Sequence, residues 1–229
     1  MTTDGIVFDE RPNLPPRWNI APAQSAPVVV EQGDGFSIRP MRWGLHPSWK
    51  KEPPEGKAII NARSETAHEK PFFRAALQRR RGVAPASAYY EWKAGPTPKQ
   101  PCEIRDADGG MLWLAALWEL WETDKGAIES FSLLTTEPNA DTRAIHHRMP
   151  VLLETAKARR AWLNSDTPEA VYRAFFKPAR DGALVVRSVS KSLNAVSAEG
   201  EALAETLYDT EKDEPPAPPK QAKQGDLFG

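Results

Sequence analysis

The alternation of apolar and polar residues predicts a chain built mainly from short strands. Short apolar runs bounded by Gly, Pro, Asn or Asp recur through residues 17–189, a pattern typical of strands joined by tight turns. Residues 33–35 (Gly-Asp-Gly) and 106–110 (Asp-Ala-Asp-Gly-Gly) each lie between two such runs and predict two hairpins. The strands are expected at residues 27–31, 36–45, 58–60, 83–92, 102–105, 111–120, 131–136, 149–153 and 184–189.

Helical spacing occurs in three places. Phe72, Phe73, Ala76 and Leu77 share one face of a predicted helix over residues 66–80. Two further helices are expected at residues 154–163 and 168–176, the second with Thr167 as its N-cap and Pro168 at its first position. The pattern predicts an α+β fold: a β-rich single domain over residues 1–208, with a mixed or antiparallel sheet or a barrel-like core and a few helices.

Residues 209–229 differ from the rest of the chain. They are rich in charged residues and proline and contain too few apolar residues to bury a core, so we expect a disordered tail. Eight acidic residues and three lysines give residues 199–229 a net charge of −5, whereas the whole chain has −1, so the first 198 residues carry +4. This mild positive charge permits contact with phosphates without requiring it, and the run Arg79-Arg80-Arg81 fits a phosphate contact or a solvated helix end equally well.

Composition limits the class of protein. The 229 residues are 40% hydrophobic and 27% charged, with no apolar run near the roughly 20 residues of a membrane span and no signal-peptide pattern after Met1. The single cysteine, Cys102, excludes an internal disulfide. We therefore expect a cytoplasmic protein without membrane contact, associated with the nucleoid if it binds DNA.

Three polar side chains follow or interrupt apolar runs: Asn61, Glu91 and His146. Glu91 lies between two aromatic residues and is either an outward strand residue or a pocket carboxylate fitted for acid–base work. His146 is either an acid–base group or part of a surface pair with His147, and neighbouring strand residues would point to opposite faces. Asn61 either satisfies backbone groups or orients a substrate. Our interpretation is that these three converge on one site.

Other residues suggest nucleic-acid contact or argue against metals. Arg63 lies two residues after Asn61 on the same predicted face, where its guanidinium would clamp a phosphate. Trp49, in a polar, proline-rich loop, is expected to stack on an unpaired base. The four histidines show no helical metal-binding pair, and neither a metal nor another cofactor is expected.

An ordered set of motifs resembles the SRAP family (SOS-response-associated peptidases, also called abasic-site processing proteins). The resemblance covers about residues 17–207 and rests on these stretches: 19–22 (Asn-Ile-Ala-Pro), 43–45 (Trp-Gly-Leu), 60–66 (Ile-Asn-Ala-Arg-Ser-Glu-Thr), 90–93 (Tyr-Glu-Trp-Lys), 135–139 (Thr-Thr-Glu-Pro-Asn), 145–150 (Ile-His-His-Arg-Met-Pro) and 189–196. It implies an enzyme with peptidase-like or lyase-like activity that crosslinks to abasic sites in single-stranded DNA during the DNA damage response.

The resemblance also implies roles for residues. Asn61 would position the reacting amine and sugar, Glu91 would move protons during imine formation, and His146 would assist ring opening and reversal. Four residues would contact DNA: Arg63, Trp49, Pro22 and Arg148. The family begins Met-Cys, and its N-terminal cysteine forms a thiazolidine with the sugar aldehyde; here Thr2 follows Met1, so the first strand and the nucleophile are expected to lie upstream of a start placed too late.

Residues 224–228 (Gln-Gly-Asp-Leu-Phe) resemble the pentapeptide by which bacterial repair proteins dock on the sliding clamp. Gln224, Leu227 and Phe228 would be the anchors on a flexible tether. Two alternatives to the crosslinking enzyme stay open: a non-catalytic single-stranded-DNA-binding adaptor tethered to the clamp, and an unrelated hydrolase that uses Glu91 and His146.

Overall fold

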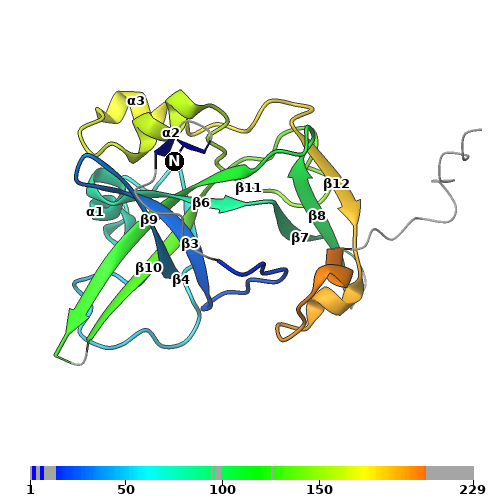
Figure 1. Ribbon diagram of the computed structural model, residues 1–229, viewed down its shortest axis with the longest axis horizontal. Helices are drawn as coiled ribbons and strands as arrows, with labels where there is room; N and C mark the ends of the chain where they lie inside the picture. The colour runs from blue at the N-terminus through cyan, green and yellow to red at the C-terminus, as the bar shows by residue number, and fades with distance from the viewer. Residues whose placement is uncertain are drawn as a thin grey trace, which may run out of the picture.

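The computed structural model describes residues 14–93, 95, 99–124 and 126–204, together with the backbone pairing of two short strands near the N-terminus (Figure 1). The strands are β1 (Thr2–Thr3), β2 (Ile6–Val7), β3 (Ser25–Gln32), β4 (Gly35–Trp43), β5 (Asn61–Arg63), β6 (Arg81–Ala86), β7 (Ala88–Lys93), β8 (Gln100–Asp106), β9 (Leu112–Thr123), β10 (Gly126–Thr136), β11 (Met149–Pro150) and β12 (Leu184–Ser188). The helices are α1 (Pro71–Arg79), α2 (Ala156–Leu163) and α3 (Glu169–Arg173), with 3₁₀ turns η1 (Lys191–Asn194) and η2 (Glu201–Ala204).

Five strands close into a barrel in the order β10-β4-β3-β6-β9 and back to β10. The pairs β3–β4, β3–β6, β6–β9 and β9–β10 are antiparallel, while β10–β4 is parallel. Closure leaves these five strands without a free edge among themselves, and β5 and β11 attach to β10 where it leaves the ring. The expected β-rich α+β domain with a barrel-like core is confirmed.

Alternation along the strands produces two cores. Val28 and Val30 belong to one buried cluster together with Met41, Leu114 and Phe131. The cluster on the other side of the same strands contains the intervening Val29 together with buried residues of the three helices, namely Phe73, Ala76, Leu77, Trp162, Leu163 and Tyr172. Side chains of period two therefore fill the barrel on one face and hold the helices on the other.

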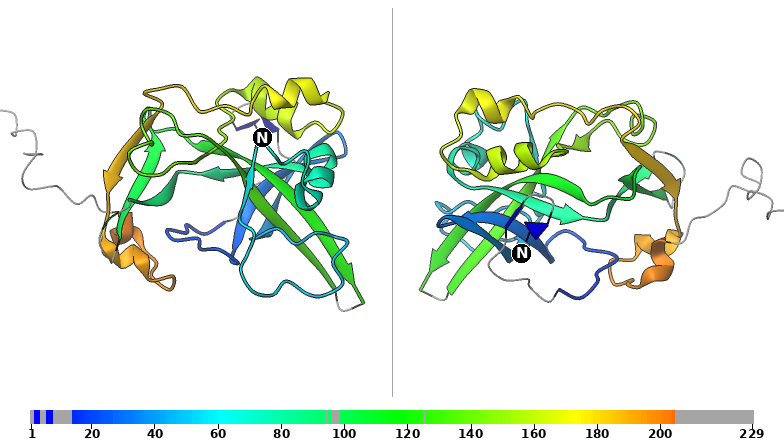
Figure 2. Two further views of the ribbon diagram at one scale, coloured as in Figure 1. Left: turned by 180° about the vertical axis from the view of Figure 1, so that it is seen from behind. Right: turned by 45° about the horizontal axis from the view of Figure 1, so that its top comes forward.

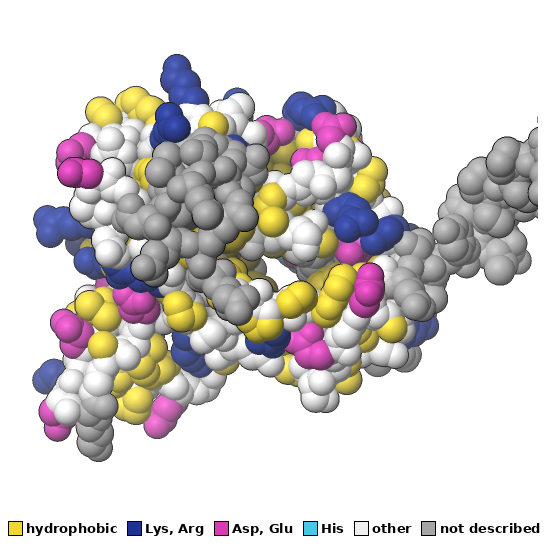
Figure 3. Space-filling view, in the orientation of Figure 1, with side chains coloured by type: hydrophobic (Ala, Val, Ile, Leu, Met, Phe, Trp, Pro, Cys, Tyr) yellow, Lys and Arg dark blue, Asp and Glu magenta, His cyan; other side chains and the backbone are white. Residues whose placement is uncertain are grey.

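A smaller sheet of order β12-β8-β7 carries Glu91. Figures 1 and 2 show it at the opposite end of the molecule from the three helices. Tyr89 and Ile104 of this sheet pack against the cluster that contains Val28 and Val30, so one face of the sheet is turned toward the barrel. On the part of the face drawn in Figure 3 that belongs to described residues, basic and acidic side chains are scattered among hydrophobic ones, and hydrophobic side chains border the central hollow.

Residues 189–204 close the outer face of the small sheet. Val189, Leu193 and Leu203 form a cluster against Trp18, Tyr90 and Trp92. The segment is fastened to the N-terminal part of the domain, because Arg17 Nε and the Trp18 amide both donate to Glu199, at 2.6 and 2.9 Å. Asn19 Nδ2 donates to the carbonyls of Ala195 and Ala198.

The predicted hairpin around residues 106–110 is wrong. The turn is present, with Asp106 accepting hydrogen bonds from the amides of Asp108 and Gly110. However, β8 pairs with β7 and β12, whereas β9 pairs with β6 and β10. Two strands adjacent in sequence therefore enter different sheets, and both pair with strands from elsewhere in the chain. The hairpin at residues 33–35 is confirmed.

The helix boundaries differ from those expected. Residues 65–69 form turns, and α1 begins only at Pro71, which is pre-organised for a first helical turn. Thr155 is the N-cap of α2, and its side chain accepts from the Ala158 amide at 3.1 Å. For α3 the N-cap is Pro168 rather than Thr167, and no side chain caps it. No helix among the described residues is long and apolar enough to span a membrane.

Candidate active site

The structure brings Glu91 and His146 together. Glu91 lies on β7, and its Oε1 is 3.6 Å from Nδ1 of His146, which lies in the turn region before β11. The two side chains are 27% and 34% exposed, so a substrate could reach both. Burial raises the pKa of the Glu91 carboxyl, and the nearby His146 offsets part of that rise. A carboxyl with a raised pKa beside an imidazole is suited to moving protons near neutrality.

His146 is oriented by the backbone of Arg148. The Arg148 amide donates to His146 Nδ1 at 3.2 Å, and Nδ1 also lies 3.1 Å from the Arg148 carbonyl oxygen. Nδ1 therefore has both a donor and an acceptor in reach, besides Glu91, and either tautomer of the imidazole finds a partner there. The backbone of Arg148 can therefore hold the His146 ring in place in either tautomer.

His147 lies beside His146 rather than opposite to it. The two ring centroids are 4.3 Å apart with an interplanar angle of 47°. The expectation that neighbouring histidines point to opposite faces is wrong, because residues 141–147 form turns and a bend instead of a strand. His147 is exposed, and its ring lies tilted against the ring of His146.

Arg148 is fixed by a carboxylate from another part of the chain. Its Nη1 and Nη2 donate to the two carboxylate oxygens of Glu65 at 2.7 and 2.9 Å, and Nη2 also donates to the Thr135 carbonyl at 2.6 Å. The hydrogen bonds from Arg148 hold the pKa of Glu65 below its usual value. Sequence reasoning missed Glu65, although it lies in the 60–66 motif, four residues after Asn61.

Asn61 and Arg63 are the exposed ends of β5, with Ala62 buried between them. Their backbones pair in parallel with Leu133 and Thr135 of β10, and Thr135 also pairs with Pro150 of β11. The strand carrying Asn61 and the segment leading from His146 thus meet on β10. Within the described residues the Asn61 side chain makes no hydrogen bond to Glu91 or His146, so convergence of all three stays a prediction.

Trp49 and Pro22 are both exposed. The Trp49 side chain is among the most exposed large apolar groups of the described residues, at 57%. Its ring meets Phe72 edge-on at 5.5 Å, and Lys50 Nζ lies 5.7 Å from its centroid. Pro22 lies in a turn in which Ala23 has a positive φ of 69° and donates its amide to the Trp43 carbonyl at 2.7 Å. These positions are compatible with the predicted DNA contacts without testing them.

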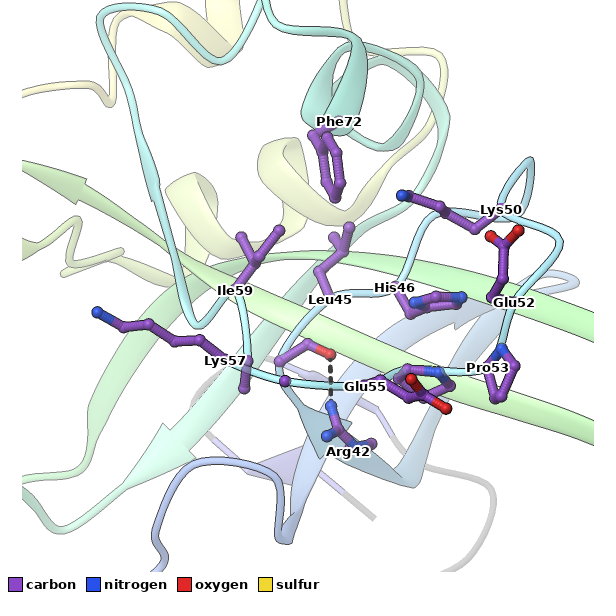
Figure 4. A pocket seen from close by; sticks show the side chains of 14 residues that line it. Arg42, Leu45, His46, Lys50, Glu52, Pro53, Glu55, Lys57, Ile59 and Phe72 are labelled. Atoms are coloured by element: carbon purple, nitrogen blue, oxygen red, sulfur yellow. Dashed lines mark hydrogen bonds between the residues drawn. The ribbon is translucent and has the colours of Figure 1, made fainter.

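A pocket of about 280 Å³ lies under the loop that carries Trp49 (Figure 4). Arg42, His46, Lys50 and Phe72 are among its lining residues, and Arg42 Nη1 donates to the Gly44 carbonyl at 3.0 Å. Burial lowers the pKa of His46. The local sequence pattern does not predict this pocket, because its walls come from β4, the loop after it and α1.

The triple arginine is not a free phosphate-binding patch. Arg80 pairs with the buried Glu119 at 2.7 Å. Arg81 is 3% exposed and donates to the carbonyls of Leu77, Gln78, Trp162 and Asn164. Its guanidinium also lies 4.5 Å from the Tyr172 ring centroid. Arg81 therefore links α1 to the end of α2. The expectation of a phosphate contact or a solvated helix end is wrong for Arg81.

Cys102 is buried, with 2% exposure. The part of the chain that the structure describes contains no group of three or more His, Cys, Asp or Glu residues arranged to hold a metal ion. The expected clamp anchors Gln224, Leu227 and Phe228 lie outside the described residues, as does the expected disordered tail from residue 209.

Comparison with known proteins identifies the family. The model of the SOS response associated peptidase (SRAP) family matches residues 3–196. The chain belongs to the SRAP family. Among SRAP relatives, the abasic site processing protein YoqW of Bacillus subtilis is 37% identical over 159 residues, which cover 69% of this chain and 70% of YoqW.

More distant relatives share the same description. The abasic site processing protein YedK of Escherichia coli is 31% identical over 150 residues, covering 66% of this chain and 65% of YedK. HMCES of Xenopus tropicalis, also named an abasic site processing protein, is 32% identical over 180 residues, covering 65% of this chain and 54% of HMCES. A solved structure from Bacteroides thetaiotaomicron has a TM-score of 0.70 at 26% identity, covering 81% of this chain and 82% of that one.

Proposed function

We propose that this SRAP protein recognises abasic sites in single-stranded DNA and becomes covalently attached to them. The observation that carries the proposal is the Glu91–His146 pair, a half-buried carboxylate 3.6 Å from an imidazole nitrogen. The names of the relatives support the substrate, since YoqW, YedK and HMCES are each called abasic site processing proteins. The resulting adduct would mark or protect the lesion during repair.

The proposed reaction requires proton transfer in two steps, ring opening and imine formation. An abasic sugar exists mainly as a closed hemiacetal, and ring opening to the aldehyde needs a proton removed from the hydroxyl and another delivered to the ring oxygen. Imine formation then needs a proton delivered to the departing hydroxyl group. His146, with partners for either tautomer, would serve ring opening, and Glu91, with its raised pKa, would serve the loss of water. Asn61 would orient the sugar from β5.

The attacking group is proposed to be an amine. Cys102 is buried, and burial raises the pKa of its thiol, which disfavours a nucleophilic thiolate at this position. An amine that condenses with the aldehyde yields an imine and water. The linkage is reversible by hydrolysis, which gives the protein a route to release itself.

DNA would be held by the exposed groups around β5 and the loop before it. Arg63 and Arg148 would contact phosphates, Trp49 would stack on a base, and Pro22 would pack beside the lesion. Because phosphate contacts release counterions, binding to intact single strands should weaken with rising salt. We expect Trp49→Ala to weaken binding by about 1–3 kcal/mol, the range for losing one stacked base.

A denaturing gel tests the proposal. Wild-type protein incubated with a single-stranded oligonucleotide that carries one abasic site should give a band of higher mass that survives denaturation. The same oligonucleotide without the lesion should give none. Glu91→Gln and His146→Ala should each slow band formation by about 10²-fold or more, the usual contribution of one acid–base group. Absence of the band with wild-type protein would reject covalent attachment and favour a DNA-binding adaptor.

A second function is tethering to the sliding clamp. The observation that favours it is the sequence 224–228 (Gln-Gly-Asp-Leu-Phe), in which Leu227 and Phe228 are apolar residues in an otherwise polar stretch. A chain lacking residues 224–229 should lose clamp binding in a surface-plasmon measurement and keep full crosslinking. Unchanged clamp affinity would rule the motif out.

A further inference from the structure

The pocket under the loop of residues 46–57 has no part in the proton transfers proposed above. One of its walls is formed by Ala58 and Ile59, and Asn61 of β5 follows two residues after Ile59. The Leu45 amide donates to the Ile59 carbonyl at 3.0 Å, which holds this wall against the end of β4. The pocket therefore adjoins the strand whose Asn61 is proposed to orient the abasic sugar.

His46 brings a buried nitrogen to the wall of this pocket. The residue is 8% exposed, and its Nε2 has no hydrogen-bond partner among the described residues. Its ring meets Trp121 edge-on, with 5.1 Å between the centroids, and Figure 4 shows it extending toward Glu52 into the space that the loop encloses. An unpaired buried polar atom is costly, so Nε2 indicates a polar partner from outside the chain.

The His46 ring can meet such a partner as a donor or as an acceptor. Burial lowers its pKa, and the positive charges of Lys50 and Arg42 lower it further, so the imidazole is neutral near pH 7. A neutral imidazole carries one N–H and one lone pair, and the tautomer decides which of them Nε2 presents. The edge of a nucleobase offers both kinds of partner.

The remaining walls suit a planar base. Leu45, Ile59 and Phe72 are apolar, and Figure 4 shows the Phe72 side chain pointing toward the other two. Phe72 also meets the exposed Trp49 ring edge-on at 5.5 Å, so the pocket continues from the residue proposed to stack on DNA. Its volume of about 280 Å³ lies just below the range of about 300–1,000 Å³ for drug-sized ligands, which fits a single base.

Charged side chains complete the lining. Arg42, Lys50 and Lys57 supply positive charge, which favours the phosphates on either side of a nucleotide. Glu52 and Glu55 supply carboxylate oxygens, which accept hydrogen bonds from an exocyclic amine. Thymine has carbonyl oxygens and no amine, so carboxylates would disfavour it.

We propose that this pocket receives the base of an unpaired nucleotide next to the abasic site and selects adenine, cytosine or guanine over thymine. His46 Nε2 pairs with the edge of the base, a carboxylate of the loop accepts from its amine, and Phe72 contacts its face. This assignment rests on the proposed function and adds to it a site that determines the preferred sequence around the lesion.

Binding without crosslinking tests the pocket. Full-length protein is titrated into fluorescein-labelled single-stranded oligonucleotides that carry a tetrahydrofuran residue, an abasic analogue without an aldehyde. The set places each of the four bases at the 5′ neighbour or at the 3′ neighbour of the analogue, and fluorescence anisotropy gives Kd. At one of the two positions, thymine should raise Kd about fivefold or more above the other bases, the lower end for one specific base contact.

Three variants assign the preference to the pocket. His46→Phe keeps a ring against Trp121, removes Nε2 and should lose the preference. The double change Glu52→Gln with Glu55→Gln, at two exposed positions, should also lose it, and this variant decides if His46→Phe does not fold. The matched control is His68→Phe: His68 has a buried, unpartnered Nδ1 but does not line the pocket, so the preference should remain.

The outcomes separate this proposal from the proposed function. Equal affinity for all four bases at both positions, in wild-type protein that still crosslinks to a true abasic site, would overturn the base pocket and leave the proposed function standing. A preference that persists in both the His46 and the Glu52–Glu55 variants would also overturn it. A preference without crosslinking would support the pocket and reject covalent attachment, and no binding to any of the oligonucleotides would overturn both.

Discussion

Glu91 Oε1 lies 3.6 Å from His146 Nδ1, although 55 positions separate the two residues in the chain. One side chain comes from the small sheet and the other from the turns before β11, so the pair forms only when the two parts of the fold come together. The Glu91 carboxylate is partly buried at this contact, and burial raises its pKa. The burial that suits Glu91 to proton transfer should therefore lower the stability of the folded protein at pH values where the carboxyl is ionised.

The first prediction concerns the pH dependence of stability at Glu91. The Glu91 carboxyl keeps its proton to a higher pH in the folded protein than in the unfolded chain. Glu91 therefore contributes favourably to folding stability at low pH, and this contribution is lost as the pH rises from the ordinary glutamate pKa through the raised one. Glu91→Gln should raise the melting temperature at pH 7.5, by about 2–4 °C for each kcal/mol recovered. The difference should shrink toward zero near pH 4. Calorimetry at both pH values measures it, and equal differences at the two would contradict the prediction.

The second prediction concerns Glu65. Removing its carboxylate frees two donors of Arg148, whose backbone holds His146. Because the Glu65 side chain is 51% exposed, Glu65→Ala should cost less than about 1 kcal/mol of stability. Crosslinking in the gel assay should slow by about fivefold to tenfold, since the Arg148 segment loses its anchor.

A matched control for Glu65 is Glu169→Ala, which breaks the exposed Glu169–Arg173 pair on α3. That variant should crosslink at the wild-type rate with a similarly small change in melting temperature. If Glu65→Ala behaves in the same way, the bidentate pair has no part in orienting His146.

The third prediction concerns Arg81. Its guanidinium donates to four backbone carbonyls, and a lysine ammonium has neither the fork geometry nor enough donors to replace it. Arg81→Lys should lower the free energy of unfolding by about 3 kcal/mol, in the range for breaking buried charged interactions. Arg79→Lys, at an exposed position two residues earlier, should change it by less than about 0.5 kcal/mol. Urea titrations compare them; equal effects would show that burial of Arg81 contributes little.

The fourth prediction concerns Gly44, in the 43–45 motif. Its φ is +137°, and an added Cβ would lie 2.6 Å from Cβ of Ala58 and 2.9 Å from Nη1 of Arg42. Gly44→Ala should therefore destabilise by about 3 kcal/mol or more, combining backbone strain with a steric clash. Gly33→Ala also has a positive φ, of +56°, but meets nothing within 4 Å, so it should cost only about 1 kcal/mol. A smaller loss at Gly44 than at Gly33 would contradict the steric argument.

Some properties could be predicted from local sequence. The short apolar runs of β3 and β10 and the Gly-Asp-Gly turn depend only on neighbouring residues, and they predicted strands and a hairpin that are present. The motif around Glu91 and the one around His146 were likewise recognisable in sequence, because each is a contiguous stretch. The family and the β-rich fold follow from such stretches taken in order, and the same stretches made Glu91 and His146 candidates for one site.

Other properties depend on partners far away in the chain, and only the tertiary structure decided them. Strand β8 pairs with β12, some 80 residues later, instead of with its neighbour β9, and no turn signal in the local sequence specifies this long-range pairing. Arg81 is buried against α2, and Arg148 is held by Glu65. His147 packs against His146 in a turn, although the local sequence resembles that of a strand. The sequence alone indicated which segments could be strands and which side chains could carry the chemistry. Long-range packing decided which charges are buried, such as Arg81, and which are paired, such as Arg148 with Glu65.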